Sequence, residues 1–249
     1  MLSESDKFRY LRHLMLDEVG ESGQEKLFSA SVLIIGAGGL GSPNALYLTA
    51  AGIGKIGILD FDKVDLSNLQ RQILHNMGDL ERFKVDSALD KVSKINDRTE
   101  FALHYEKISD DNICDLIKPY QFIIDATDNF EAKFLINSAC VRENKPFAHA
   151  GIYKFCGNAM SILPRKSACL ACAFEAPPPK ELNSFFKAGL FGAVPGVLGC
   201  IQASECIKYF LGTGEMLYNR LLSVDLKKMI FREVAVKRNE KCLVCGGES

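Results

Sequence analysis

The sequence predicts an α/β protein with a doubly wound sheet whose first half is parallel and whose second half continues in antiparallel strands. Three observations lead to this prediction. An apolar, β-branched run at residues 31–35 passes directly into a glycine-rich turn and then into a helix-like stretch. Strand-like and helix-like segments then alternate as far as residue 150. After Gly151 the alternation gives way to short strand-like segments around one helix-like stretch.

The first half can be divided element by element. Residues 1–30 are a polar, partly helical lead-in. The strand at 31–35, the helix at 42–51 and the strand at 55–59 form a βαβ unit, because two parallel strands need a crossover connection. Further helices are expected at 84–95, 110–117 and 131–143, and further strands at 99–105, 121–124 and 146–150. This order is typical of a Rossmann-like fold.

The second half has a different texture. Segments 157–163 and 221–236 are expected to extend the same sheet with antiparallel strands, and 197–211 to form a helix. Residues 177–196 are rich in proline, glycine and phenylalanine, which predicts a long crossing loop. We therefore expect a single domain over residues 1–249, with a nucleotide-binding half at 31–151 and a second half at 152–249.

Composition excludes several classes of protein. The 249 residues are 47% hydrophobic and 24% charged, with a formal net charge of -1. Such a balance gives no basic field for nucleic acid or an anionic membrane. No apolar run approaches the ~18 residues needed to span a bilayer, and the N-terminal residues do not have the pattern of a signal peptide. We expect a cytoplasmic enzyme that binds neither nucleic acid nor membrane.

The glycine turn is the first candidate site. Gly36-x-Gly38-x-x-Gly41 joins a strand to a helix, so that backbone N–H groups at the helix start point toward a bound phosphate. Asp60 ends the next strand, where its carboxylate can accept hydrogen bonds from ribose hydroxyls. The pattern predicts a nucleotide site. The alternative is a purely structural glycine turn beneath a helix.

A cluster of polar residues indicates which nucleotide is bound. The segment 67–72, which contains Arg71, follows the second strand, and Lys84 opens the next helix. Two cations near the glycine turn would suit a triphosphate, since they can neutralise the charge that builds as pyrophosphate departs. This favours ATP. Taken singly, either cation could equally be a solvated surface residue.

Asp128 is the candidate ligand for Mg²⁺. It follows a buried strand, which brings it to the carboxyl edge of the sheet, and carboxylate oxygens suit a Mg²⁺ ion that bridges to phosphates. The alternative role for Asp128 is to cap the helix expected to begin near Phe130.

Four of the nine cysteines form two Cys-x-x-Cys pairs, Cys169 with Cys172 and Cys242 with Cys245. Four thiolates make a closed tetrahedral zinc site with no open position for catalysis, so we expect a structural Zn²⁺. A redox dithiol is the alternative, but that motif normally opens a helix in a βαβ context. The single cysteines and the four histidines are expected to be structural.

Taken together, these motifs resemble those of a known family, the MoeB/ThiF/HesA branch of the ubiquitin-activating superfamily. The resemblance extends over nearly the whole chain. The matching segments are 9–12, 36–41, 60–62, 67–72, Lys84, 127–129, both Cys-x-x-Cys pairs and 202–208. It implies a single ThiF-type adenylation domain that works as a homodimer. The implied partner is a ubiquitin-like sulfur carrier, MoaD-like or ThiS-like, with a C-terminal Gly-Gly tail. The implied reaction uses ATP and Mg²⁺ to convert the tail carboxylate into an acyl-adenylate with release of pyrophosphate, for molybdopterin or thiamine biosynthesis.

The resemblance also implies individual residue roles. Gly39 would line the phosphate loop, and Asp60 would hold the ribose. Asp128 would bind Mg²⁺, and Arg12 would reach the site of the other subunit. The remaining residues expected to bind the nucleotide are Asp62, Ser67, Asn68, Arg71, Lys84 and Asn129.

One departure from the family concerns covalent chemistry. Members that form a thioester or persulfide carry a cysteine in the crossing loop, near the position of Phe185 or Phe186, and residues 183–190 contain none. Covalent capture of the activated carrier is therefore not expected. Cys156, at an expected turn, is the one cysteine that could replace it.

Two other classes of function remain as alternatives. A nicotinamide-dependent oxidoreductase would share the glycine turn and Asp60, but it leaves Arg71, Lys84 and the cysteine pairs unexplained. A non-catalytic partner subunit of an activating heterodimer would typically have lost its ATP-site residues, and here they are present.

Overall fold

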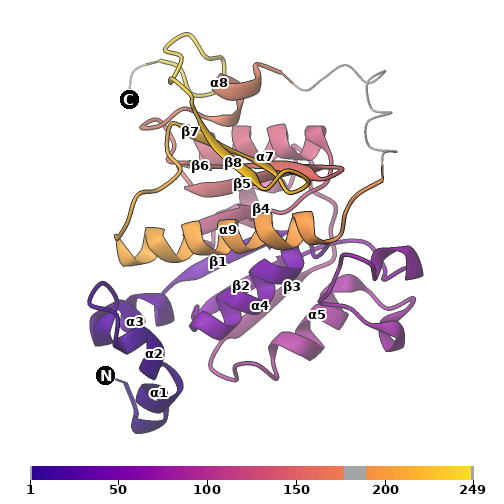
Figure 1. Ribbon diagram of the computed structural model, residues 1–249, viewed down its shortest axis with the longest axis vertical. Coiled ribbons are helices and arrows are strands. Elements are labelled where there is room, and N and C mark those ends of the chain that lie inside the picture. The colour runs from indigo at the N-terminus through magenta and orange to yellow at the C-terminus, as the bar shows by residue number, and fades with distance from the viewer. Residues whose placement is uncertain (1, 177–188, 248–249) are drawn as a thin grey trace.

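The computed structural model describes residues 2–176 and 189–247, and within them the chain forms an eight-stranded sheet covered by helices (Figure 1). The order of the strands is β3-β2-β1-β4-β5-β6-β7-β8. The strands are β1 (Ser31–Ile35), β2 (Lys55–Leu59), β3 (Glu100–His104), β4 (Phe122–Asp125), β5 (Phe147–Tyr153), β6 (Cys156–Ile162), β7 (Arg220–Asp225) and β8 (Ile230–Ala235).

The helices connect these strands and precede them. They are α1 (Glu4–Arg9), α2 (Leu11–Leu14), α3 (Gly20–Phe28), α4 (Gly41–Ala51), α5 (Lys84–Val92), α6 (Ile113–Ile117), α7 (Phe130–Arg142), α8 (Leu170–Phe174) and α9 (Ala193–Leu211), with two 3₁₀ turns, η1 (Leu66–Asn68) and η2 (Met77–Asp79). None of the helices in this part of the chain is long and apolar enough to cross a membrane.

The predicted change from parallel to antiparallel pairing is confirmed. Strands β1 to β5 pair in parallel, and the pairs β5–β6, β6–β7 and β7–β8 are antiparallel. The change falls at the tight connection between Tyr153 and Cys156, which needs no crossover helix.

Several element boundaries differ from the prediction. Helix α9 begins at Ala193, inside the segment expected to be a loop, because Pro195 lies in its first turn, where a missing N–H costs no hydrogen bond. Helix α5 ends at Val92 rather than at residue 95, and α6 begins at Ile113 rather than at residue 110. The expected loop over 177–188 lies outside the described residues.

Alternate residues of the central strands build two separate cores. Val32 and Ile34 of β1 pack with Leu48 of α4 and Leu198 of α9. Leu33 and Ile35, together with further apolar residues, face the helices on the other side, α6 and α7. Strands buried on both faces carry continuous apolar runs, which explains why the sequence of β1 shows no alternation.

The lead-in packs against the C-terminal end of α4. Asn96 Nδ2 donates to the Tyr10 hydroxyl over 2.7 Å, and Gln24 Nε2 donates to the carbonyl of Ala51 over 2.9 Å. The N-terminal end of α4 follows the glycine turn. Helices α1 to α3 therefore lie at the opposite end of α4 from that turn (Figure 1).

Candidate nucleotide and metal sites

The glycine turn is shaped by two close backbone approaches. Gly36 has a φ of 106°, and a Cβ there would lie 2.6 Å from the carbonyl oxygen of Ala126. A Cβ on Gly41 would lie 1.9 Å from the carbonyl oxygen of Gly36. Any side chain at these two positions would displace the backbone. The turn is therefore packed directly against the residues that follow β4.

The middle of the turn faces a polar side chain. Among the described residues, a Cβ on Gly38 would meet only the Gln72 amide, whose nitrogen would lie 3.5 Å away. Gln72 is buried, and its Oε1 atom has no hydrogen-bond partner in the described chain. A buried amide without a partner costs free energy unless a ligand or water satisfies it. The residues here therefore fit a polar ligand on the glycine turn.

Asp60 connects the turn to the second strand. Its carboxylate accepts hydrogen bonds from the backbone N–H groups of Ala37, at 2.8 Å, and Asp62, at 2.9 Å. Burial raises the pKa of this carboxyl group, and the nearby ammonium of Lys84 opposes the rise. Asp60 is thus held rigidly beside the turn, in the place predicted for a ribose-binding acid.

Lys84 lies between two carboxylates. Its Nζ atom is 2.9 Å from Asp62 Oδ2 and 4.0 Å from Asp60 Oδ2. The ammonium is buried, whereas Asp62 is exposed. Because Lys84 starts α5, its side chain emerges at the carboxyl edge of the sheet, where the glycine turn also lies. The cation and the turn are therefore brought together as predicted.

Arg71 lies beside Gly39 of the turn. A Cβ on Gly39 would be 3.6 Å from Arg71 Cγ and 3.0 Å from Pro195 in the first turn of α9. The guanidinium donates to the carbonyl of Ser67 over 3.1 Å. Ser67 is exposed and Asn68 half-buried, and both belong to the 3₁₀ turn η1. Arg71 therefore borders the turn directly, and Ser67 and Asn68 lie further out.

Asp128 and Asn129 have different local roles. Asn129 is the N-cap of α7, and its side-chain oxygen accepts a hydrogen bond from the N–H of Ala132. The capping role considered for Asp128 is therefore filled by its neighbour. Asp128 is exposed and accepts a 3.3 Å hydrogen bond from Asn129 Nδ2. Its carboxylate is available to a cation.

Arg12 does not join the other predicted site residues of its own chain. It is exposed on α2, in the lead-in at the far end of α4. Within the described chain its guanidinium has no hydrogen-bond or ion-pair partner.

Sequence reasoning expected His75 to be structural but missed its specific role, which is to support the glycine turn. The imidazole of His75 is buried, with Nε2 2.9 Å from the carbonyl oxygen of Ala37 and Nδ1 2.8 Å from the Ser87 hydroxyl. Burial lowers its pKa, so the ring is neutral at pH 7. No motif in the sequence marks this role, because Ala37 lies 38 residues away.

It also missed a buried polar cluster at the end of β4. Asp125 accepts hydrogen bonds from Lys133 on α7 and His149 on β5, and Gln202 of α9 donates to its backbone carbonyl. Neither Asp125 nor Lys133 belongs to a motif that the sequence reveals. The partners are 8 to 77 residues apart, which a linear motif does not reveal.

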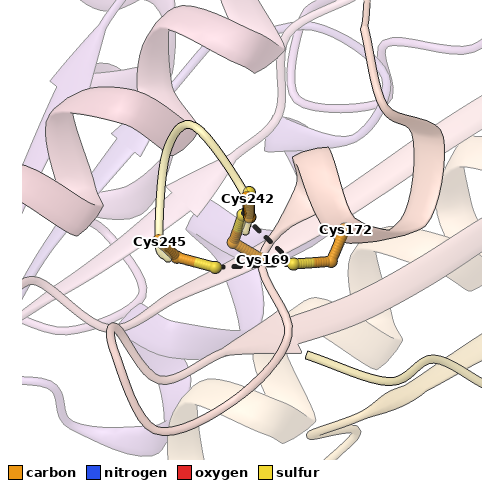
Figure 2. Close-up of side chains that lie close together, drawn as sticks. All are labelled: Cys169, Cys172, Cys242 and Cys245. Atoms are coloured by element: carbon orange, nitrogen blue, oxygen red, sulfur yellow. Dashed lines mark hydrogen bonds between the residues drawn. The ribbon is translucent and has the colours of Figure 1, made fainter. Parts of the chain in front are cut away.

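The two Cys-x-x-Cys pairs form one cluster (Figure 2). The four Sγ atoms lie within 4.8 Å of one another. Cys169 Sγ is 3.9 Å from Cys172 Sγ and 3.8 Å from Cys242 Sγ, and Cys172 Sγ is 3.4 Å from Cys245 Sγ. Cys169 and Cys172 belong to the start of α8, and the other two lie on the C-terminal segment. Four converging thiols fit a tetrahedral zinc ion.

The surroundings of the cluster shift the pKa values of its thiols in different directions. Burial opposes ionisation of Cys242, but the backbone N–H groups of Cys245 and Val244 outweigh it and lower the pKa of Cys242 to about 7. Burial raises the pKa of Cys169 and that of Cys245. A cation would stabilise all four as thiolates, because metal binding displaces their protons.

Comparison with known proteins shows what the chain is similar to. A model of the ThiF family matches residues 10–244. The adenylyltransferase and sulfurtransferase MOCS3 of Culex quinquefasciatus is 39% identical over 246 residues, covering 98% of this chain and 56% of that protein. The probable adenylyltransferase/sulfurtransferase MoeZ of Mycobacterium tuberculosis is 40% identical over 243 residues, covering 96% of this chain and 62% of that protein. The chain thus spans about three fifths of the length of these two relatives.

A relative of similar length and a solved structure complete the comparison. The sulfur carrier protein adenylyltransferase of Thermus thermophilus is 37% identical over 246 residues, covering 96% of this chain and 91% of that protein. The crystal structure of E. coli MccB with MccA-N7isoASN superimposes with a TM-score of 0.86 at 25% identity, over 98% of this chain and 76% of that chain.

Proposed function

The chain belongs to the ThiF family, and from that premise we propose that it is an ATP-dependent adenylyltransferase for a small ubiquitin-like sulfur carrier. In this reaction a carboxylate oxygen of the carrier's C-terminal glycine attacks the α-phosphorus of ATP. A new phosphorus–oxygen bond forms, the bond to the leaving pyrophosphate breaks, and the product is an acyl-adenylate. The carrier is MoaD-like or ThiS-like, and the pathway is molybdopterin or thiamine biosynthesis.

The observation that carries the proposal is the unbroken series of contacts around the glycine turn. Lys84 approaches Asp60, whose carboxylate binds the turn through Ala37. Arg71 borders the turn at Gly39. Two cations beside the glycine turn suit a reaction in which negative charge moves from the carboxylate to pyrophosphate. Hydride transfer from a nicotinamide would not need them.

The positions of Asp128 and of the four cysteines support roles for two metal ions. Mg²⁺, held by the exposed carboxylate of Asp128, would screen the triphosphate charge when it is bound. Zn²⁺, held by the four cysteines, would join α8 to the C-terminal segment. It would have no part in the reaction, because four protein ligands leave no open position.

Arg12 supports a homodimer within this proposal. It lies at the opposite end of α4 from the glycine turn and, within the described residues, has no partner of its own. We propose that it serves the active site of the partner subunit. Its position in its own chain requires a partner subunit for any role in catalysis.

The lack of a cysteine at the expected position in the crossing loop bears on what happens to the adenylate. The expected position of a loop cysteine, at Phe185 or Phe186, lies outside the described residues, and the sequence has none there. We propose that the carrier leaves, or stays bound, as the adenylate. A sulfur donor would then attack the acyl carbon directly, forming a carbon–sulfur bond while the carbon–oxygen bond to AMP breaks and AMP leaves.

Exchange of labelled pyrophosphate into ATP tests the proposal. The full-length protein is incubated with MgATP and each sulfur carrier of its source organism, and the carrier is weighed for an added adenylate. Exchange should depend on the carrier, and a carrier lacking its terminal glycine should give none. If none of the organism's carriers supports exchange and the protein binds NADH tightly, an oxidoreductase would be favoured instead.

A further inference from the structure

A fully compensated group of buried charges lies at the carboxyl end of β4. Asp125 is wholly buried, and Lys133 Nζ lies 3.2 Å from each of its carboxylate oxygens. His149 Nδ1 lies 2.8 Å from Asp125 Oδ2. The ammonium of Lys133 also donates to the carbonyl of Ala150 over 2.7 Å. We refer to Asp125, Lys133 and His149 as the β4 cluster.

The carboxylate of Asp125 also fixes the backbone that follows it. Its Oδ1 atom accepts hydrogen bonds from the N–H of Thr127, at 3.2 Å, and from the Thr127 hydroxyl, at 2.6 Å. Between them, the N–H of Ala126 donates to the carbonyl of Ile35. The next residue is Asp128. The turn that presents Asp128 is therefore built on a buried carboxylate whose charge Lys133, His149 and Thr127 stabilise.

The same group is joined to α9 directly and to α4 through a side chain of α9, and both helices border the glycine turn. Gln202 of α9 donates to the backbone carbonyl of Asp125 over 2.7 Å and accepts from Asn44 of α4 over 3.1 Å. Gly36 approaches the carbonyl of Ala126 so closely that no Cβ would fit. The turn at 125–128 and the phosphate loop are thus packed as one unit.

Stability alone does not account for such a group. A buried ion pair repays its desolvation only with good geometry, and well-packed apolar residues of the same volume are often as stable. Burial opposes ionisation of Asp125, yet Lys133, His149 and Thr127 together lower its pKa. The Asp125 carboxylate accepts two hydrogen bonds from Thr127, so the buried charges are joined to the backbone that leads to the candidate Mg²⁺ ligand.

We propose that Lys133 is a positioning residue for adenylation, which acts through the Asp125 carboxylate to hold the 125–128 turn and so places Asp128 beside the glycine loop. The inference rests on the adenylation proposed above. It assigns Lys133 no contact with substrate. Without the ammonium of Lys133, the carboxylate of Asp125 would be a buried charge with no cation beside it. Keeping the turn in its present geometry would then cost free energy.

The central test replaces Lys133 by methionine, which keeps the length of the side chain and removes its charge. The Mg²⁺ concentration for half-maximal pyrophosphate exchange should rise by about tenfold or more, as happens when partners that orient a metal ligand are removed. The KM for the carrier should change little. Lys133→Arg keeps the charge and should restore the Mg²⁺ dependence.

A matched control separates positioning from stability. Lys145 also uses its ammonium to bind two backbone carbonyls, those of Lys118 and Tyr120, but at the opposite end of β4. Lys145→Met should lower the melting temperature and leave the Mg²⁺ dependence unchanged. If Lys133→Met also lowers the melting temperature but leaves the Mg²⁺ dependence of the folded protein unchanged, the proposal is wrong.

Two further measurements cover the remaining outcomes. In an Asp128→Ala background, Lys133→Met should have little further effect, whereas equal effects in both backgrounds would overturn the inference. If Lys133→Met does not fold, Thr127→Val removes one donor to Asp125 and should shift the Mg²⁺ dependence in the same direction, and no shift would count against the proposal. Calorimetric titration with MgATP needs no carrier, so it tests the inference even if exchange fails in the wild type.

Discussion

The side-chain oxygen of Asn129 accepts a 2.8 Å hydrogen bond from the backbone N–H of Ala132. This cap gives Asn129 a structural role and leaves the adjacent carboxylate of Asp128 free of one. Neighbouring polar residues at the start of one helix are thus expected to differ in what their loss affects.

Replacing each residue by alanine should separate stability from activity. Asn129→Ala removes the cap and should lower the free energy of unfolding by about 1 kcal/mol. Asp128→Ala should leave unfolding nearly unchanged and should lower the exchange rate and weaken its dependence on Mg²⁺. Chemical denaturation and exchange assays at varied Mg²⁺ measure the two effects. A larger loss of stability for Asp128→Ala than for Asn129→Ala would contradict the assignment.

The subunits should complement one another if Arg12 acts across a dimer. Arg71→Ala alone should slow exchange on the order of 10², as expected for loss of a charge donor in the transition state. Mixed Arg12→Ala and Arg71→Ala subunits should recover on the order of a quarter of the wild-type rate, because half the dimers would hold one intact site. No recovery, with subunit exchange verified by mass, would place Arg12 outside the partner's site.

The four-cysteine cluster should bind one zinc ion per chain. Because metal-binding energy is also folding energy, a chelator should lower the melting temperature. Cys245→Ser should lose the metal, whereas Cys156→Ser, which changes a cysteine outside the cluster, should retain it. Elemental analysis and thermal melts measure both effects. Metal-free protein, purified under reducing conditions, that melts at the same temperature would disprove a structural zinc.

Stability should fall as the pH drops below about 6.5, the ordinary pKa of histidine. Burial lowers the pKa of His75 and of His149 in the folded protein. The unfolded chain therefore binds more protons than the folded chain between the lowered pKa and the ordinary one, and unfolding becomes easier. His149→Gln should flatten the melting temperature against pH, and Lys145→Met should keep the wild-type slope. An unchanged slope in His149→Gln would show that His149 does not contribute.

Cys156 should be dispensable for activation of the carrier. It is exposed at the start of β6, opposite Tyr153 at the end of β5. Cys156→Ala should therefore leave pyrophosphate exchange largely unchanged. Denaturing electrophoresis with and without thiol reductant tests for a covalent link. A carrier adduct that maps to Cys156 and is cleaved by the reductant would make it a nucleophile.

Much of the fold was predictable because its signals are local. Continuous apolar runs marked β1 and β2, and the glycine turn marked the start of α4. The beginning of α9 was not predictable, because Gly192 and Pro195 have the composition of a loop until packing against the glycine turn is known. Local composition therefore predicted the strands better than the start of this helix.

The candidate site shows the same division. Asp60, Lys84 and Asp128 each follow a strand or open a helix, so topology alone brings them to one edge of the sheet. His75 and Lys133 lie in segments without a motif, and their roles depend on partners brought close only by folding. Sequence reasoning thus found the groups that could contact a ligand and missed those that support them.

Strand β1 carries aliphatic side chains on both faces, which affects how its register in the sheet is specified. A slip of one residue would exchange Val32 and Ile34 with Leu33 and Ile35, and each core would still receive aliphatic side chains. Hydrophobicity therefore penalises the error only weakly. The correct alignment is specified where the strand ends, by the glycine at position 36, which no other residue can replace there, and by the polar turn packed against it. Gly36, which belongs to the predicted phosphate loop, thus also fixes the register of β1, so that substitutions of Gly36 should produce misfolded protein as well as inactive protein.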